Sequence, residues 1–316
     1  MAPVRIGLLT TARINDAILD GARRGDAAEV VAVGSRDLAR AEAYARERGI
    51  ERAHGSYEAV LADPDVDAIY VALPNALHVE WATRALEAGK HVLVEKPFST
   101  RPEEVEATFD LAERAGLVLM EAFMYRHQPQ AKRLKELVDE GAIGGLRLVR
   151  AQFSFDLTRP VDVRLDPELG GGALLDVGAY CVNVSRLVAG EPEVVHAERV
   201  VGPSGVDVRF AGVMRFPGDV LGHFDCGFDV PRRHEVEVAG SEGLLRLSPA
   251  FGDDRGVLEL HRGDELETVP LPETHRYQLE VENFAAAVRG DEPPLLGRAD
   301  AVGQARALAA LLAAAR

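Results

Sequence analysis

Apolar segments alternate with amphipathic ones along the first third of the chain. The apolar segments predict five short strands, at residues 4–9, 29–34, 68–73, 91–94 and 117–120. The intervening segments predict helices, at residues 12–24, 38–48 and 102–115 and where Leu77, Trp81 and Ala85 recur at four-residue spacing. Strands that are apolar throughout and separated by helices predict a parallel sheet covered on both faces. The expected fold of this region is therefore α/β, a doubly wound Rossmann sheet.

The pattern changes to alternation of single residues in the second half. Residues 206–216 and 220–228 alternate apolar and polar side chains around Pro217-Gly218-Asp219, which predicts a hairpin with one buried face. Further strands are predicted at residues 146–155, 193–201, 235–239 and 244–247, and helices at 173–188 and in the Ala-rich tail 299–316. This part is expected to be α+β with a large, mostly antiparallel sheet. We place the domain boundary after residue 121, which gives domains 1–121 and 122–316.

Composition narrows the class of protein. The 36 Lys and Arg residues against 51 Asp and Glu give a formal net charge of −15, which opposes binding to nucleic acid. An anionic ligand must then be held locally, by a helix N-terminus or a few placed cations. The two cysteines, Cys181 and Cys226, are too few for a disulfide scaffold. No apolar run is long enough to span a membrane and no signal-peptide pattern is present, so we expect a cytoplasmic protein without a membrane partner.

The turn after the first predicted strand is a candidate nucleotide site. It reads Gly7-Leu8-Leu9-Thr10-Thr11-Ala12-Arg13 and opens a predicted helix, whose N-terminal amides suit a pyrophosphate. Gly7, Leu9 and Ala12 take the places of the three glycines in Gly-x-Gly-x-x-Gly, so the fingerprint is degenerate. A simple capped helix start would look the same, and this turn alone does not decide between the two.

The end of the second predicted strand indicates which nicotinamide cofactor is used. NAD-binding chains carry Asp or Glu there, which accepts a hydrogen bond from the ribose 2′-hydroxyl. This chain has Ser35-Arg36, which removes the carboxylate and offers a guanidinium to a 2′-phosphate, with Arg40 one helical turn further on. A solvated Arg at a helix start is the alternative, and the neighbouring Asp37 favours it. We predict NADP as the cofactor, with NAD as the second choice.

Two further segments carry candidate catalytic residues. Glu95-Lys96-Pro97 follows the fourth predicted strand, and open α/β sheets bind ligands beyond the carboxyl ends of strands, so Lys96 is expected at the cofactor crevice. The segment from Gly170 to Tyr180 combines three glycines with a helix that places Asp176 and Tyr180 on one face. A surface lysine and a packing tyrosine are the alternatives. A carboxylate in an apolar helix fits them less well, because its burial is costly unless it is paired.

Lys96 and Tyr180 together suit hydride transfer to or from a carbinol. Oxidation of an alcohol needs a base for the hydroxyl proton, and a free tyrosine, with a pKa of about 10, is a poor base at neutral pH. A neighbouring ammonium favours the phenolate form. We therefore predict Tyr180 as the acid/base, assisted by Lys96, with Asp176 orienting Lys96 or a substrate hydroxyl.

Four motifs carry a resemblance to a known family. They are Glu95-Lys96-Pro97, Pro74-Asn75-x-x-His78, the segment 121–126 and the segment from Gly170 to Tyr180. With them the chain resembles the glucose-fructose oxidoreductase, inositol dehydrogenase and rhizopine catabolism (Gfo/Idh/MocA) family along nearly its whole length. Tyr180 stands where many members carry His, which is similar to the branch of glucose-fructose oxidoreductase, dimeric dihydrodiol dehydrogenase and NADP-dependent xylose dehydrogenases.

The resemblance implies site residues, a substrate class and an assembly. The substrate would be a sugar, polyol or trans-dihydrodiol, with Arg164, Asp176 and Tyr180 near its pocket. An open-faced C-terminal sheet would join subunits into a homodimer or homotetramer, and Arg126 would lie close to the nicotinamide. The expected cofactor-binding residues are Gly7, Thr10, Thr11, Ala12, Arg13, Ser35, Arg36, Leu73, Pro74, Asn75, His78, Glu95, Lys96 and Arg126. No metal site is expected, because the nine histidines show no clustering of ligand type.

The predicted activity is that of an NADP-dependent dehydrogenase or reductase acting on CH–OH groups. One alternative is an NAD(P)-assisted glycoside hydrolase or eliminase that oxidises its substrate transiently. The other is a non-catalytic NADP-binding sensor. Lys96, Asp176 and Tyr180 argue against the sensor, because a sensor needs only the first domain.

Overall fold

The computed structural model describes residues 2–159 and 161–316, which form two compact units. The first unit runs to His127 and also includes His275–Val302. The second comprises Gln128–Thr274 and Gly303–Arg316. The chain thus leaves the first unit shortly after the boundary predicted at residue 121, and it returns to that unit for a segment that the sequence prediction placed in the second domain.

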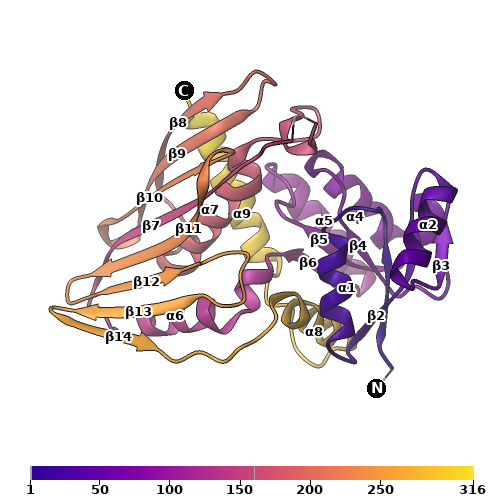
Figure 1. Cartoon of the computed structure of the whole chain (residues 1–316), viewed down its shortest axis with the longest axis horizontal. Helices are drawn as coiled ribbons and strands as arrows, with labels where there is room; N and C mark the ends of the chain where they lie inside the picture. Colours follow the sequence, from indigo (N-terminus) through magenta and orange to yellow (C-terminus); the bar gives the residue numbers. More distant parts are fainter. Residues whose placement is uncertain (1, 160) are drawn as a thin grey trace. The chain divides into compact units, whose positions relative to one another are not determined.

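The first unit contains the predicted doubly wound sheet (Figure 1). Its six strands are all parallel and follow the order β3-β2-β1-β4-β5-β6. The strands are β1 (Val4–Leu8), β2 (Ala28–Gly34), β3 (Arg52–His54), β4 (Ala68–Val71), β5 (His91–Glu95) and β6 (Leu119–Ala122). The strand order reverses between β1 and β4, and ligands of such sheets bind at that point, beyond the carboxyl ends of the strands.

The helices of the first unit agree with the prediction, apart from one helix that begins later than predicted and two helices that were not predicted. They are α1 (Asn15–Arg23), α2 (Leu38–Arg48), α3 (Tyr57–Leu61), α4 (His78–Glu87), α5 (Pro102–Ala115) and α8 (Arg276–Arg289), with the short turns η1 (Asn75–Leu77) and η2 (Met124–His127). Helices α2 and α5 have the predicted bounds, each ended by a left-handed glycine, Gly49 or Gly116. Helix α1 begins at Asn15 and not at residue 12, and the side-chain amide of Asn15 donates back to the carbonyl oxygen of Thr10 (2.6 Å). Neither α3 nor α8 was predicted.

The second unit is built on one eight-stranded sheet of order β14-β13-β12-β11-β7-β10-β9-β8. Only β7 and β10 pair in parallel among its described neighbours, so the predicted, mostly antiparallel sheet is confirmed. The strands are β7 (Leu146–Asp156), β8 (Val194–Val201), β9 (Asp207–Phe216), β10 (Val220–Gly227), β11 (Asp229–Gly240), β12 (Leu244–Ser248), β13 (Val257–Arg262) and β14 (Glu265–Val269). The hairpin β9–β10 turns at Pro217–Asp219, as predicted. Strands β13 and β14 were not predicted.

Helices cover one face of this sheet. Helices α6 (Pro129–Asp139) and α7 (Ala179–Ala189) pack on it, and α9 (Arg298–Ala314) ends the chain (Figure 1). Phe210 and Phe224 stack at 6.0 Å within the core below these helices. On the same two strands, Val213 and Leu221 are 47% and 48% exposed, so the strands alternate between a buried and an open face.

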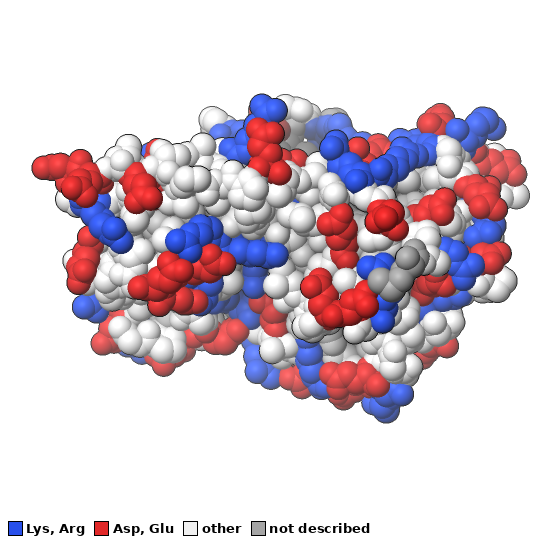
Figure 2. Space-filling view, turned by 90° about the horizontal axis from the view of Figure 1, so that it is seen from below, with Lys and Arg blue, Asp and Glu red and all other residues white. Residues whose placement is uncertain are grey.

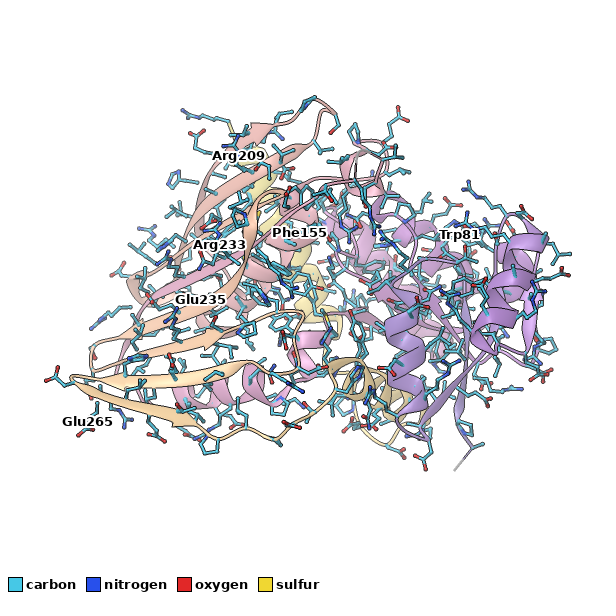
Figure 3. The ribbon with its side chains drawn as sticks, in the orientation of Figure 1. Trp81, Phe155, Arg209, Arg233, Glu235 and Glu265 are labelled. Atoms are coloured by element: carbon cyan, nitrogen blue, oxygen red, sulfur yellow. The ribbon has the colours of Figure 1, made fainter. Side chains whose placement is uncertain are left out.

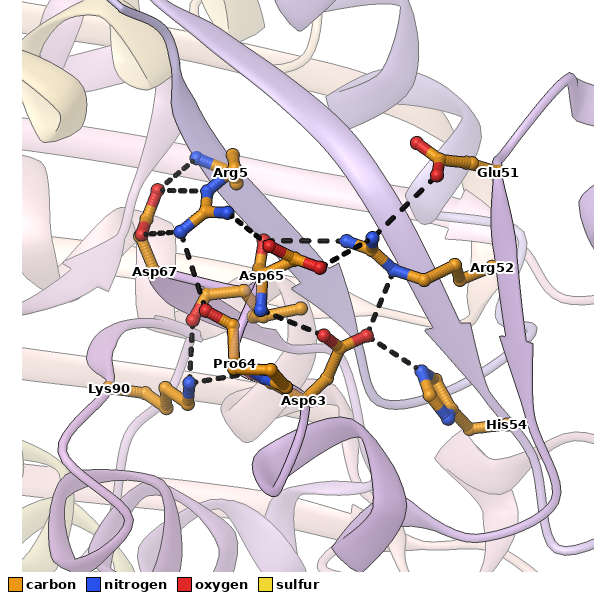
Figure 4. A network of polar contacts seen from close by, with 10 residues as sticks. Arg5, Glu51, Arg52, His54, Asp63, Pro64, Asp65, Asp67 and Lys90 are labelled. Carbon is orange, nitrogen blue, oxygen red and sulfur yellow. Dashed lines mark hydrogen bonds and ion pairs between the residues drawn. The ribbon is translucent and has the colours of Figure 1, made fainter.

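A polar network links the amino ends of β1, β4 and β5 to strand β3 in the first unit. Its members are Arg5, Arg52, His54, Asp63, Asp65, Asp67 and Lys90 (Figure 4). Arg5, at the start of β1, binds Asp67 through Nε (3.0 Å) and Nη2 (2.8 Å). Lys90, just before β5, donates to the carbonyl oxygens of Asp63 (2.8 Å) and Val66 (2.6 Å). The network therefore lies at the edge of the sheet opposite the expected ligand site.

Two properties bear on partners. None of the helices in the described ranges is both long and apolar enough to cross a membrane. Acidic and basic side chains are interspersed over the face shown in Figure 2, so the charge of −15 is not gathered into one patch on that face.

Candidate functional site

The turn after β1 is shaped by its own polar contacts. Thr10 Oγ1 accepts a hydrogen bond from the amide of Ala12 (3.0 Å) and donates to the carbonyl oxygen of Ala72 (3.3 Å). Gly7 lies inside β1, where a Cβ would come within 2.7 Å of Val60 Cγ1, so close packing on α3 accounts for this glycine. The turn reaches the carboxyl edge of the sheet beside the switch point. Pyrophosphate contacts from Gly7 and from Thr10 to Arg13 remain predictions.

The end of β2 offers two cations. Arg36 and Arg40 are exposed, and their guanidinium groups make no hydrogen bond or ion pair with any residue that the structure describes. Asp37 does not neutralise them, because its carboxylate caps α2 and accepts from the amide of Arg40 (3.3 Å). Ser35 is buried, and its hydroxyl accepts from the amide of Asp37 (3.2 Å). These residues fit a 2′-phosphate, which needs cationic donors and no facing carboxylate.

His78 joins the segments that follow β4 and β5. It is fully buried at the start of α4, with Nε2 lying 2.7 Å from the carbonyl oxygen of Leu73 and Nδ1 lying 2.8 Å from that of Pro97. Both ring nitrogens are therefore used within the protein. Pro74, which follows Leu73, and Asn75, the first residue of η1, are half-buried. His78 thus contacts the backbone of both segments. Its predicted contact with the cofactor remains a prediction.

Lys96 lies in a segment that is held on several sides. The Lys96–Pro97 peptide bond is cis, and Lys96 itself is half-buried. The amide of Phe98 donates to Glu121 Oε1 (2.8 Å), and Glu121 is buried at the end of β6. Glu95 Oε1 accepts from the hydroxyl of the buried Tyr70 (2.5 Å). These contacts fix the backbone that carries Lys96 at the carboxyl edge of the sheet.

Arg126 occupies the short helix η2 of the same unit. Its Nη1 pairs with Asp300 Oδ1 (3.2 Å), and its side chain is largely buried. Asp300 comes from the segment that returns to this unit near the end of the chain. The contact orients Arg126, whose proximity to the nicotinamide stays a prediction.

In the second unit the structure brings Arg164 and Asp176 into contact. Arg164 Nε lies 2.6 Å from Asp176 Oδ2, and its Nη1 lies 3.2 Å from Asp162 Oδ1. The pKa of Arg164 is raised above its usual value, and the negative charge of Asp176 is the largest cause of this rise. The Arg164 guanidinium also lies 5.9 Å from the centre of the Phe155 ring. Figure 3 labels Phe155 on β7. Asp176 is therefore a paired carboxylate, which explains how an apolar helix tolerates it.

Two glycines let the Arg164 segment pack against the start of the helix that carries Asp176 and Tyr180. The amides of Gly171 and Gly172 donate to the carbonyl oxygens of Asp166 (2.8 Å) and Arg164 (2.9 Å). A Cβ at Gly171 would lie 2.5 Å from the carbonyl oxygen of Arg164, and Gly172 has a φ of +126°. The glycine run is thus required by the close approach of the chain that carries Arg164.

Asp207 anchors this helix, and sequence reasoning missed it. It is buried at the start of β9, and its Oδ2 accepts from the amide of Leu174 (2.7 Å). Its Oδ1 occupies the space that a Cβ at Gly172 would need. Burial raises the pKa of Asp207, and the amide of Leu174 opposes that shift. No local pattern marks Asp207, because its partner stands far away in the sequence.

The helix that carries Asp176 and Tyr180 begins irregularly. Leu174–Gly178 forms a π-helical turn (η4) that leads into α7, and π turns are frequent at functional sites. The Tyr180 ring is 6% exposed and packs against Phe153 (5.4 Å between centroids) and Phe251 (5.5 Å). Tyr180 is thus a nearly buried phenol in an aromatic wall. Lys96 belongs to the first unit and Tyr180 to the second.

Comparisons with known proteins agree with the motifs. The model of the GFO/IDH/MocA oxidoreductase family, with an NAD-binding Rossmann fold, matches residues 5–123, and the model of the GFO/IDH/MocA C-terminal domain matches residues 131–246. A D-xylose 1-dehydrogenase (NADP(+)) from Haloferax volcanii is 40% identical over 96% of this chain and 95% of its own length. A trans-1,2-dihydrobenzene-1,2-diol dehydrogenase from Oryctolagus cuniculus is 39% identical over 69% of this chain and 67% of its own length.

A solved structure shows the same fold. The 3-ketoreductase from Actinomadura kijaniata, in complex with NADP and TDP-benzene, superposes with a TM-score of 0.94 at 34% identity, over 99% of this chain and 98% of the other. The two family models together span most of the chain. The resemblance inferred from the motifs is therefore confirmed: the chain belongs to the GFO/IDH/MocA family of oxidoreductases.

Proposed function

We propose that the protein is an NADP-dependent dehydrogenase or reductase that transfers a hydride between the nicotinamide and a CH–OH group of a sugar, polyol or trans-dihydrodiol. The observation that carries the proposal is that Lys96 and Tyr180 are each held by a dedicated set of contacts. His78 and Glu121 hold the segment of Lys96, and Asp207 holds the helix of Tyr180. A packing lysine or tyrosine would need no such support.

The chain's own residues handle the proton and the substrate. NADP, when bound, supplies the hydride acceptor or donor. In the oxidative direction the Lys96 ammonium favours the phenolate form of Tyr180. Tyr180 Oη then takes the hydroxyl proton of the substrate. In the reductive direction Tyr180 returns the proton to the carbonyl oxygen. The paired Arg164 and Asp176 offer a donor and an acceptor to further hydroxyl groups of the substrate.

Relatives support the cofactor and the catalytic pair. The Haloferax volcanii relative is named as NADP-dependent, and the Actinomadura kijaniata structures contain NADP. The latter protein has also been solved as a tyrosine-to-phenylalanine mutant and as a lysine-to-alanine mutant. The two mutated positions are separated by the same number of residues as Lys96 and Tyr180. We therefore assign the same two roles to Lys96 and Tyr180.

A substrate panel tests the proposal. Aldoses, inositols and trans-dihydrodiols are each assayed with NADP and with NAD at the nicotinamide absorbance. Net reduction of NADP by at least one substrate is expected. Product without net change of the cofactor supports a hydrolase or eliminase, and cofactor binding without any turnover supports a sensor.

Reduction of a keto sugar is the second candidate. Four relatives named dTDP-3,4-didehydro-2,6-dideoxy-α-D-glucose 3-reductase are 34–37% identical to this chain. Their substrates carry a nucleoside diphosphate, whereas Arg164 here is already paired with two carboxylates. Incubation of such a keto sugar with NADPH decides between the two: oxidation of NADPH favours this candidate.

The open face of the eight-stranded sheet is the proposed contact between subunits of a homodimer or homotetramer in the cytoplasm. Some of its polar side chains pair within the face: Arg233 contacts Gln152 (3.0 Å) and Glu235 contacts Arg246 (2.6 Å). Arg233 and Glu235 are labelled in Figure 3. Val213 and Leu221 lie exposed on the same face. Replacement of both by Lys is expected to convert the assembly to monomers, as measured by light scattering.

A further inference from the structure

Gln304 is a buried amide that contacts the backbone directly before Tyr180. It lies on α9, and its Nε2 is 2.9 Å from the carbonyl oxygen of Ala179. That carbonyl belongs to the peptide group that joins Ala179 to Tyr180. Both residues lie in the second unit, where α9 passes beside α7 (Figure 1). The proposed proton transfer does not involve Gln304 itself.

The contacts of the side-chain oxygen decide which way the Gln304 amide faces. Its Oε1 accepts from Arg186 Nη1 (3.0 Å) and from Asn183 Nδ2 (3.3 Å). A guanidinium group has only donors, so the oxygen of Gln304 must face it and not the nitrogen. The Nε2 group therefore faces Ala179 and donates to its carbonyl oxygen.

Arg186 is itself anchored by a charged pair. Its Nε and Nη2 donate to Glu191 Oε2 (2.9 Å) and Oε1 (2.6 Å), and the Arg186 side chain is buried. Gly303, directly before Gln304, makes room for this pair, because a Cβ at Gly303 would overlap with Arg186 Nη2 and Glu191 Oε1. The guanidinium group to which Gln304 binds is thus fixed in place.

The bond from Gln304 lies at the end of the π turn η4. Such turns are rare and are frequent at functional sites. Asp207 accepts from the amide of Leu174, the first residue of the turn, and Gln304 donates to the carbonyl oxygen of Ala179, the residue directly after it. Side chains from β9 and α9 therefore hold the turn at both ends, just before Tyr180.

We propose that Gln304 is a positioning residue for Tyr180, whose direction it sets by fixing the peptide group before it. The proposal rests on the proposed function. Phe153 and Phe251 pack against the ring of Tyr180, whereas Gln304 holds its backbone. A displacement of about 1 Å at a reacting group can lower a rate by about 100-fold, so one bond at this point affects turnover.

Gln304→Glu and Gln304→Met test the donated bond. The first variant keeps an oxygen for Arg186 and loses the donor, because the neighbouring guanidinium group keeps the new carboxyl group ionised. The second keeps the length of the side chain and loses both groups. With a substrate that the wild type turns over, both variants should lower kcat by about 10- to 100-fold. The substrate KM and the Kd for NADP should stay within about twofold.

Ser185→Ala is the matched control on α7. Ser185 is buried, and its Oγ donates to the carbonyl oxygen of Cys181 (2.8 Å), away from the π turn. The control loses a bond of the same kind, so its Tm should fall. Its kcat should stay close to that of wild type.

Combination with Tyr180→Phe shows whether the effect passes through the phenol. Gln304→Met should change the residual kcat of Tyr180→Phe by less than about twofold, because no hydroxyl group is left to misplace. Equal falls in the two backgrounds would overturn the inference. So would an unchanged kcat in both Gln304 variants, or a fall in Ser185→Ala as large as that in Gln304→Met.

If the Gln304 variants do not fold, Glu191→Ala decides. Its side chain is 60% exposed, so its removal frees the Arg186 guanidinium group with little loss of packing. A lower kcat with an unchanged Kd for NADP supports the inference, and an unchanged kcat refutes it. A wild type that turns over no substrate of the panel contradicts the proposed function itself, whereas an active wild type with equally active variants contradicts only the role of Gln304.

Discussion

His78 Nδ1 lies 2.8 Å from the carbonyl oxygen of Pro97, directly after Lys96 in the chain. Its Nε2 lies 2.7 Å from the carbonyl oxygen of Leu73, so one imidazole lies between the segments that follow two neighbouring strands. Burial lowers the pKa of His78 to about 4, more strongly than the two carbonyl groups raise it. The ring is therefore neutral at pH 7 and donates to one of the two oxygens.

This neutral ring makes stability depend on pH. An unfolded histidine takes up a proton near pH 6.5, and the folded His78 does so only near pH 4. The free energy of unfolding should therefore fall as pH decreases through this range, by up to about 3 kcal/mol from His78. His78→Gln should lack this component in urea unfolding series, whereas the exposed His196→Gln should retain it. Identical pH profiles for wild type and His78→Gln would contradict the assignment.

Asp207→Ala should lower the rate of catalysis without weakening the binding of NADP. The variant leaves the amide of Leu174 buried and unbonded, which costs about 1–3 kcal/mol of stability. Because that amide starts the helix of Tyr180, kcat should fall while the Kd for NADP stays within about twofold. Asp207→Asn keeps an acceptor oxygen and should be affected less. Steady-state kinetics and thermal unfolding check this, and an unchanged kcat in Asp207→Ala would rule out the positioning role.

Tyr180→Phe removes the hydroxyl group and keeps the aromatic packing against Phe153 and Phe251. Turnover should fall by about 100-fold or more, because general acid–base catalysis contributes about that much. NADP binding, measured by fluorescence titration, should remain close to wild type. Comparable turnover would remove Tyr180 from the mechanism.

Arg36→Ala should raise the KM for NADP and leave the KM for NAD unchanged. A charged hydrogen bond to a phosphate contributes about 1.5–3 kcal/mol, which corresponds to a rise of about 10- to 100-fold. Arg40→Ala should add to the effect. Arg46→Ala, an exposed arginine on the same helix, serves as the control. An equal loss with both cofactors would show that Arg36 does not contact the 2′-phosphate.

Asp63→Asn should lower stability and leave the site intact. Asp63 accepts from the amide of Asp65 (2.9 Å) and contacts Arg52 (3.0 Å) and His54 (3.0 Å). Burial opposes ionisation, but these contacts together lower the pKa of Asp63. The stabilisation is therefore present above pH of about 3.8 and is lost as pH falls further. Chemical unfolding should show a loss of about 1–3 kcal/mol at pH 7, with a smaller difference in acid and an unchanged Kd for NADP.

Long helices with a regular apolar period were predicted from the sequence better than short elements or elements whose position depends on contacts between distant segments. Helices α2 and α5 were bounded correctly because their apolar spacing ends at a glycine. Strand β3 was missed because three residues show no period, and β14 because most of its side chains are exposed. Helix α8 was missed although Tyr277, Val281 and Phe284 have helical spacing.

In the candidate site, too, residues that stand in motifs were predicted and contacts between distant segments were not. Lys96 and Tyr180 stand in recognisable motifs, and the family is confirmed. The pairing of Arg164 with Asp176 and the anchoring by Asp207 depend on contacts between distant segments. Single-sequence reasoning has no access to such contacts. The predicted role of Asp176, orienting Lys96 or a substrate hydroxyl, is accordingly extended by a partner that the sequence did not reveal.

The return of the chain to the first unit governs how this protein can fold during synthesis. Helix α8 supplies Tyr277 and Glu280 to the interior beside α1 and β2, yet it is translated after the whole eight-stranded sheet. Until residue 289 has left the ribosome, the apolar face beneath α8 has no cover from this helix. The nucleotide-binding half therefore completes its folding late, and nascent chains that stop before α8 expose a surface for chaperones.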